Sequence, residues 1–204
     1  MKVLITGRNV LLGKKLITLL QQKEGVEIIA TSRGSARVQQ PDEVNYHALD
    51  VTNNTAVIGL FKKIQPDVVI HTAAMTQVDD CELNQEECKV ANIEAVRNVI
   101  AGCQAINGHL VHLSTDFIFD GQQSHPYTEE DNANPLGVYG QSKWEGEKGV
   151  SEIIPDAVIL RTAWVYGIHG NNFVKTILRL ASERYELRVI DDQVGTPSWT
   201  VDIT

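Results

Sequence analysis

The sequence predicts an α/β protein with a doubly wound, Rossmann-type parallel sheet, and three observations lead to this fold class. Short apolar runs alternate along the chain with segments whose apolar residues recur at helical spacing. The first run, residues 2–6, ends in Gly7 and passes directly into such a helical segment. The connecting loops are short, as in repeated βα units. Because crossover helices join parallel strands, we expect a sheet covered on both faces.

The elements follow in chain order. The strand at 2–6 precedes a helix near 12–23, where Leu11, Leu12, Leu16, Leu19 and Leu20 share one face. The run at 26–30 follows within the length of a βαβ unit and supplies the second strand. The same alternation places the other strands near 44–48, 67–72, 109–114 and 157–162, and the other helices near 53–64, 85–106, 138–150 and 171–184. The longest polar interruption is the loop at 121–135.

Bulk properties exclude several functional classes. The chain has 204 residues, enough for a sizeable core, and its formal net charge of −8 argues against a nucleic-acid surface. No apolar run reaches the roughly 18 residues that a membrane span requires. The first apolar run is too short for a signal peptide, so we expect a cytoplasmic protein that contacts no membrane. The oligomeric state stays open, a homodimer included.

Cysteines and histidines point to no metal or disulfide framework. Cys81, Cys88 and Cys103 lack a Cys-x-x-Cys spacing, which fits reduced, buried thiols in a cytosolic protein. The six histidines show no metal-ligand spacing, and we predict no metal site.

The turn after the first strand is where a dinucleotide is expected to bind. Amides at a helix N-terminus attract a pyrophosphate, and glycines let the backbone approach it. The expected contacts are Gly7, Asn9, Val10, Leu11, Leu12 and Gly13. Alternatively, Gly7 is only a turn and Gly13 only a packing site. Val10 stands where a middle glycine is expected, and its branched side chain could crowd the phosphates.

Residues after the second and third strands bear on the choice of cofactor. No acidic residue follows the second strand, whereas Arg33, with Arg37 as a further candidate, could pair with a 2′-phosphate. This favours NADP, with NAD still open; the alternative is a solvated basic loop. Asp50 and Val51 are expected to face the adenine, with Asp50 accepting from its amino group. Otherwise Asp50 is a helix cap.

A second group of residues carries catalytic chemistry. Thr115 ends an apolar run, and Tyr139 and Lys143 begin a helical pattern. Residues four apart share one helix face, so a hydroxyl from a neighbouring strand could meet both. An adjacent ammonium is expected to lower the pKa of the phenol from near 10, which would make Tyr139 a general acid at neutral pH. The alternative is an ordinary amphipathic surface.

Motifs along essentially the whole chain resemble the extended short-chain dehydrogenase/reductase superfamily and, within it, the dTDP-4-dehydrorhamnose reductase family. The residues that carry the resemblance are 5–7, 66–71, 73–74, 112–116, 119–121, 139–143, 161–167, 171–175 and 192–197. Their order and spacing make it specific. The resemblance implies reduction of the 4-keto group of dTDP-6-deoxy-L-lyxo-4-hexulose to dTDP-L-rhamnose, with hydride from a nicotinamide.

The resemblance also assigns roles to particular residues. Tyr139 would donate the proton, Lys143 would lower its pKa and hold the nicotinamide ribose, and Thr115 would orient the substrate oxygen. Further cofactor contacts would come from Ala73 and Ala74. The substrate contacts would fall on Thr76, Val78, Thr115, Asp116, Phe117 and Trp164. Trp164 would offer an aromatic wall, the alternative being a core aromatic.

Three departures from the family pattern matter: Val10, Phe117 in place of a tyrosine, and the end of the chain at Thr204. We expect residues 1–155 to form the NADP-binding domain, and residues 156–204 the last strand and the start of a truncated substrate lobe. Two other functions stay open. One is a sugar-nucleotide epimerase or dehydratase, although Asp116-Phe117 lacks the Asp-Glu pair of dehydratases. The other is a non-catalytic NADP-binding protein similar to the regulatory β subunit of methionine adenosyltransferase.

Overall fold

The computed structural model describes residues 1–35 and 44–204. Within them, six parallel strands form one sheet in the order β3-β2-β1-β4-β5-β6. The strands are β1 (Lys2–Thr6), β2 (Glu27–Ser32), β3 (Asn45–Ala48), β4 (Val68–His71), β5 (His109–Thr115) and β6 (Val158–Thr162). The order runs outward in both directions from β1 and β4. The predicted doubly wound sheet is confirmed, and the strand order reverses between β1 and β4.

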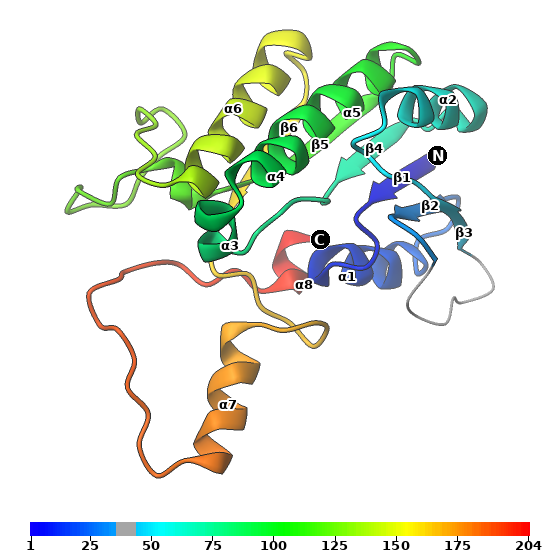
Figure 1. Ribbon diagram of the computed structural model, residues 1–204. Helices are drawn as coiled ribbons and strands as arrows, with labels where there is room; N and C mark the ends of the chain where they lie inside the picture. Colours follow the sequence, from blue (N-terminus) through cyan, green and yellow to red (C-terminus); the bar gives the residue numbers. More distant parts are fainter. Residues whose placement is uncertain (36–43) are drawn as a thin grey trace.

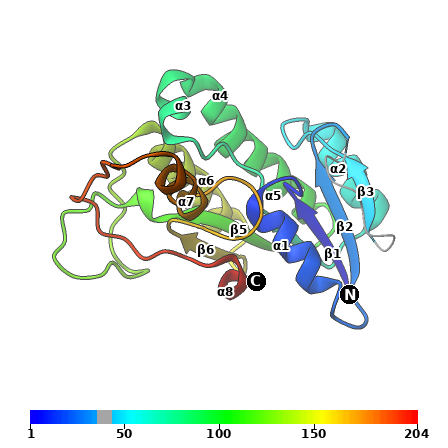
Figure 2. The same ribbon diagram turned by 90° about the horizontal axis from the view of Figure 1, so that it is seen from below.

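Helices cover both faces of the sheet (Figure 1). On one side lie α2 (Asn54–Ile64), α3 (Val78–Leu83), α4 (Gln85–Lys89), α5 (Ala95–Gln104) and α6 (Val138–Ile153). On the other lie α1 (Leu11–Leu20) and α8 (Thr200–Ile203), which are seen together from below (Figure 2). None of these helices, nor α7 (Phe173–Glu183), is both long and apolar enough to cross a bilayer in the described part of the chain.

The two faces of β1 explain the three consecutive apolar residues at its centre. Leu4 packs with Phe61 and Ile100 in the core under α2 and α5. Val3 and Ile5 point the other way, into the core under α1. Since successive side chains of a strand alternate between faces, a strand buried on both must be apolar throughout.

The segment predicted as one helix over 85–106 contains more than one kind of helix. A π-helical turn, Val90–Glu94, separates α4 from α5. It carries Asn92, which is 1% exposed and bonds the backbone of Met75 in both directions, at 2.9 and 3.0 Å. The short helix α3 was not predicted, because its sequence, Val-Asp-Asp-Cys-Glu-Leu, has too few apolar residues for a periodicity. Together these elements fix the loop that follows β4.

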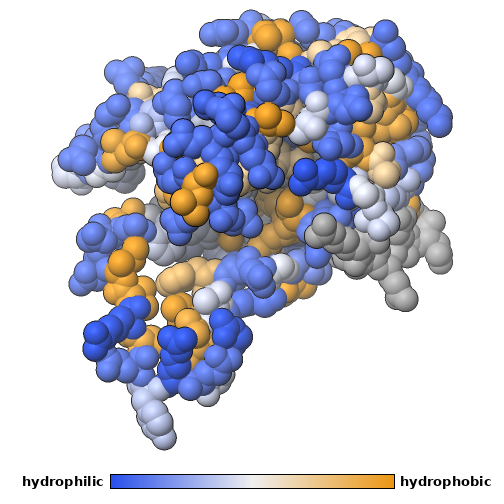
Figure 3. Space-filling model, viewed as in Figure 1, coloured by the Kyte–Doolittle hydropathy of each residue, from blue (hydrophilic) through white to orange (hydrophobic). Residues whose placement is uncertain are grey.

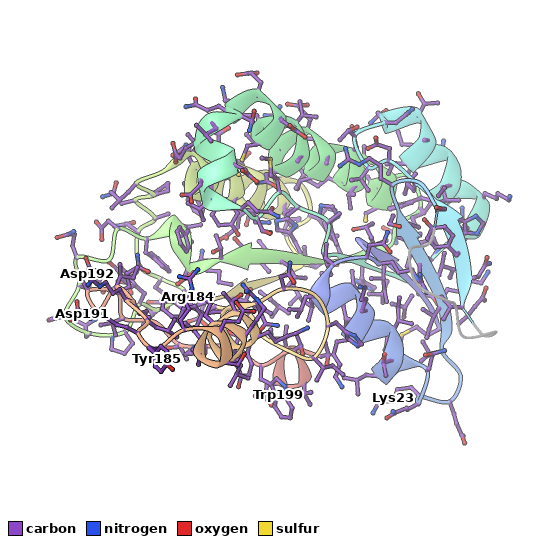
Figure 4. All side chains as sticks on the ribbon, turned by 60° about the horizontal axis from the view of Figure 1, so that its bottom comes forward. Lys23, Arg184, Tyr185, Asp191, Asp192 and Trp199 are labelled. Carbon is purple, nitrogen blue, oxygen red and sulfur yellow. The ribbon has the colours of Figure 1, made fainter. Side chains whose placement is uncertain are left out.

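Helix α7 stands away from the layers, whereas α8 packs beside α1 (Figure 1). Asn172 caps α7 by accepting from Lys175 N at 3.1 Å, yet no residue of α7 is buried. Apolar side chains gather over this helix in the space-filling view (Figure 3), with Phe173 and Leu178 exposed. Arg184, Tyr185, Asp191 and Asp192 follow on the segment that leads back to Trp199 and α8 (Figure 4).

Candidate active site

The site lies at the carboxyl edge of the sheet, where the strand order reverses and ligands bind in open α/β sheets. Gly7 leaves β1 with φ +75°, and a Cβ there would lie 2.7 Å from Ala73 N after β4. A Cβ on Gly13 would collide with the Gly7 carbonyl oxygen. Both glycines are therefore required by the backbone itself. The turn thus comes close to Ala73, whereas the contact predicted for Ala74 stays a prediction.

Val10 does not strain this turn. It is the N-cap of α1 with extended backbone (φ −81°, ψ 164°), and its amide donates to Gly7 O at 2.9 Å. A glycine is not needed at that conformation. Its side chain is 36% exposed, so whether it crowds a phosphate stays a prediction.

Arg8 is the residue of this turn that the sequence interpretation missed. It is only 4% exposed, and its Nε and Nη1 have no hydrogen-bond partner among the described residues. The guanidinium lies 5.7 Å from the centroid of the Tyr46 ring. A buried charge ordinarily has a partner, and a guanidinium matches a phosphate well. The signal was a basic residue directly after the first glycine.

The end of β2 is tied to the same turn. Arg8 N donates to Thr31 O at 2.9 Å, and Asn9 Nδ2 donates to Ser32 Oγ at 2.8 Å. The following residue, Arg33, is exposed. Arg37 lies outside the described residues. The orphaned Arg8 guanidinium fits a phosphate group of a dinucleotide, and Arg33 follows the strand to which this turn is hydrogen-bonded.

Asp50 is engaged in a turn before α2. Its Oδ1 accepts from Thr52 N at 3.0 Å and from Thr52 Oγ1 at 2.8 Å. Burial opposes ionisation of the carboxyl, but these bonds outweigh it and lower the pKa of Asp50. The alternative that Asp50 caps the helix is wrong, because the N-cap is Asn53. Val51 packs partly buried against the core.

The three catalytic candidates meet at the ends of β5 and α6. Tyr139 is 8% exposed and Lys143 4%, and both belong to the buried side of α6. Lys143 Nζ donates to Leu113 O of β5 at 2.6 Å. The Thr115 hydroxyl, at the end of β5, faces the phenol and favours its ionised form. A hydroxyl, a phenol and an ammonium thus line one buried corner.

The pKa values correct one expectation. Burial raises the pKa of Tyr139 to about 12 despite the Thr115 hydroxyl, and the charge of Asp116 adds to the rise. The prediction that Lys143 lowers the phenol pKa is therefore wrong here, because desolvation dominates. Burial also lowers the pKa of Lys143 to about 8, opposed by the Glu147 carboxylate. At neutral pH the phenol is protonated and can donate.

Two histidines that the sequence interpretation did not single out lie in the adjoining strands. His71 and His112 are paired in register on β4 and β5, with ring centroids 5.5 Å apart. His71 Nδ1 and Thr6 Oγ1 are 2.7 Å apart. Burial first, and then the Lys143 charge, lowers the pKa of His71 to about 3 and pushes the His112 pKa well below its usual value. Both rings are therefore neutral and add no positive charge to the site.

The substrate-side candidates fall into two groups. Asp116 and Phe117 lie beside the catalytic corner: Phe117 meets the Tyr139 ring edge-on at 5.5 Å, and burial raises the pKa of Asp116. Val78 packs with the cluster around Tyr139, whereas Thr76 is exposed on the loop before α3.

Trp164 lies farther along the chain, and the alternative that it is a core aromatic is wrong. Its side chain is 39% exposed, and its φ of +46° is rare for a bulky residue. Its ring meets Phe173 of α7 edge-on at 5.6 Å. Such strained, exposed aromatics are typical of binding sites.

Comparisons with known proteins identify the relatives of this chain. A family model described as RmlD substrate binding domain matches residues 1–204. The dTDP-4-dehydrorhamnose reductase of Aggregatibacter actinomycetemcomitans is 38% identical over 202 residues, covering 99% of this chain and 64% of that protein. The solved dTDP-4-dehydrorhamnose reductase of Clostridium acetobutylicum is 40% identical with a TM-score of 0.87, covering 100% of this chain and 67% of that one.

The corresponding Bacillus anthracis enzyme, solved in complex with NADP, is 37% identical with a TM-score of 0.83, covering 99% of this chain and 67% of that one. The chain thus spans about two thirds of the length of its relatives: 64%, 66% and 65% of three curated ones.

Proposed function

The chain belongs to the RmlD family of dTDP-4-dehydrorhamnose reductases, and from this premise we propose that it takes part in the NADPH-dependent reduction of the 4-keto group of a dTDP-6-deoxy-4-hexulose to dTDP-L-rhamnose. The observation that carries the proposal is the buried corner of Thr115, Tyr139 and Lys143, at the same carboxyl edge of the sheet at which Gly7 follows β1. Residues 1–155 hold the cofactor in this proposal, and residues 156–204 begin the substrate-binding part.

The residues of the corner divide the chemistry among them. A bound NADPH supplies the hydride. The protonated phenol of Tyr139 donates a proton to the oxygen that becomes an alkoxide, and the Thr115 hydroxyl orients that oxygen. Lys143, whose ammonium donates to Leu113 O at 2.6 Å, would hold the ribose of the bound nicotinamide.

The cofactor preference follows from the arginines. The Bacillus anthracis relative was solved with NADP bound. In this chain Arg8 offers a buried guanidinium without a partner in the described residues, and Arg33 stands at the end of the adjoining strand. Both would bind the 2′-phosphate that distinguishes NADPH from NADH. NAD can still occupy the site more weakly.

The test is an assay of NADPH consumption with the dTDP-linked 4-keto-6-deoxy sugar, followed by identification of the sugar product. We expect one NADPH oxidised per dTDP-L-rhamnose formed. Binding of NADPH without any turnover would contradict catalysis by this chain. A different sugar product with full turnover would refute the substrate but keep the reductase chemistry.

A further inference from the structure

Two cysteine thiols touch each other directly behind the catalytic tyrosine. Cys81 of α3 and Cys88 of α4 are both fully buried, and their Sγ atoms are 2.7 Å apart. A disulfide bond measures about 2.05 Å, so closing it would move the sulfurs together by about 0.7 Å. Helices α3 and α4 are joined at Asn84, and this hairpin places the two cysteine side chains against each other.

This thiol pair is packed against the active site. Cys81, Cys88 and Tyr139 form one buried cluster. Cys88 Sγ lies 3.3 Å from Ser142 Oγ, whose hydroxyl donates to Tyr139 O at 2.8 Å. On the other side, Cys81 Sγ donates to Met75 O at 3.9 Å, on the loop that leads to Thr76. A change at the sulfurs therefore reaches both the first turn of α6 and the substrate-side loop.

We propose that Cys81 and Cys88 form a reversible disulfide by exchange with a small-molecule disulfide, and that the oxidised pair slows the reaction at Tyr139. In the first step one cysteine thiolate attacks the external disulfide and releases one small thiol. In the second, the other cysteine attacks the mixed disulfide and releases the second thiol. The two protein thiols are oxidised, and the external disulfide is reduced to two thiols. A small dithiol restores the two protein thiols by the same kind of exchange and is itself oxidised to a cyclic disulfide.

The surroundings of the pair set its reactivity. Burial, the neighbouring thiol and the carboxylates of Glu82 and Asp80 raise the pKa of Cys81 to about 12, so little thiolate exists in the closed protein. Exchange therefore requires transient opening of the α3–α4 hairpin. Leu83, at its tip, is 81% exposed and gives the hairpin little anchoring.

The effect on catalysis rests on the proposed function. Oxidation removes the thiol hydrogen that bonds Met75 O and draws α3 toward α4. Since a displacement of 1 Å in an active site can cost two orders of magnitude in rate, we expect kcat/KM to fall on the order of tenfold for a shift of this size.

The experiment uses cystamine, a dicationic disulfide suited to the carboxylates around the pair. After incubation of the native chain, intact mass and a tryptic digest are measured. We expect a loss of two hydrogens, located in the peptide that holds both Cys81 and Cys88, and its reversal by dithiothreitol. Cys103→Ala, which removes the third buried cysteine, should behave like the wild type, and Cys88→Ala should form no internal disulfide.

Three outcomes would overturn the proposal. One is an unchanged mass for the folded chain under conditions in which the urea-unfolded chain is oxidised. Another is a cystamine adduct that persists on Cys81 or Cys88. The third is full reductase turnover by fully oxidised protein. If the reduced chain shows no turnover, the proposed function has failed, and the mass measurement still decides the disulfide.

Discussion

Replacing Arg8 by methionine tests two effects of its buried charge: binding of the 2′-phosphate of NADPH, and destabilisation of the protein without cofactor. Methionine keeps most of the apolar stem and removes the guanidinium, which is 4% exposed and lacks partners for Nε and Nη1 in the described chain. A hydrogen bond to a charged group contributes about 1.5–3 kcal/mol. If Arg8 binds the 2′-phosphate, the Kd for NADPH rises by about 10- to 150-fold, while the Kd for NADH changes little.

The same substitution has the opposite effect on the protein alone. Buried donors without partners cost about 1–3 kcal/mol, so Arg8→Met should raise the free energy of unfolding measured without cofactor. Lys23→Met is the matched control, because it removes the same charge from an exposed site on the segment after α1 (Figure 4). Fluorescence titrations with both nucleotides and urea unfolding check the two effects. Unchanged NADPH binding, or equal weakening of NADPH and NADH, would refute the 2′-phosphate assignment.

Two further substitutions test the turn and the lysine. Gly13→Ala places a Cβ against the Gly7 carbonyl, so it should abolish NADPH binding and destabilise the fold. The control is Gly59→Ala in α2, where a Cβ meets nothing within 4 Å; in thermal unfolding it should stabilise the fold by about 0.4–1 kcal/mol. Equal effects of the two substitutions on stability would contradict the close packing at Gly13. Burial holds the pKa of Lys143 near 8, below its value in the unfolded chain, so the unfolded state binds more protons between about pH 8 and 10.5. The buried ammonium therefore destabilises the fold fully below pH 8, and this cost is relieved as the pH rises. The stability gained from pH 7.5 to 10 should therefore be smaller in Lys143→Met than in the wild type, by about 2 kcal/mol, and an equal gain would show that the lysine is not buried as a charge.

The parts of the fold that could be predicted from sequence are those with a repeating physical cause. Strands buried on both faces must be continuously apolar, which located β1 and β2 within one or two residues. Tyr139 and Lys143 were placed on one helix face by their spacing alone, because helical geometry leaves no other arrangement.

The parts that could not be predicted depend on burial and on contacts between distant segments. Arg8 looks like any surface arginine until the turn folds against Tyr46 and encloses it. The sign of the Tyr139 pKa shift depends on how far water is excluded from the phenol, which spacing does not reveal. The Cys81–Cys88 contact needed α3, a helix too short and polar to be predicted.

The most direct test of the account is the turnover of Tyr139→Phe compared with Tyr185→Phe. Both remove one phenolic hydroxyl, but Tyr139 is 8% exposed in the corner, whereas Tyr185 is fully exposed on the segment after α7 (Figure 4). Because general-acid catalysis contributes about 10²- to 10⁴-fold, kcat for the keto sugar should fall by that factor in Tyr139→Phe, with NADPH still bound, and stay unchanged in Tyr185→Phe. Full turnover by Tyr139→Phe would contradict its role as the proton donor.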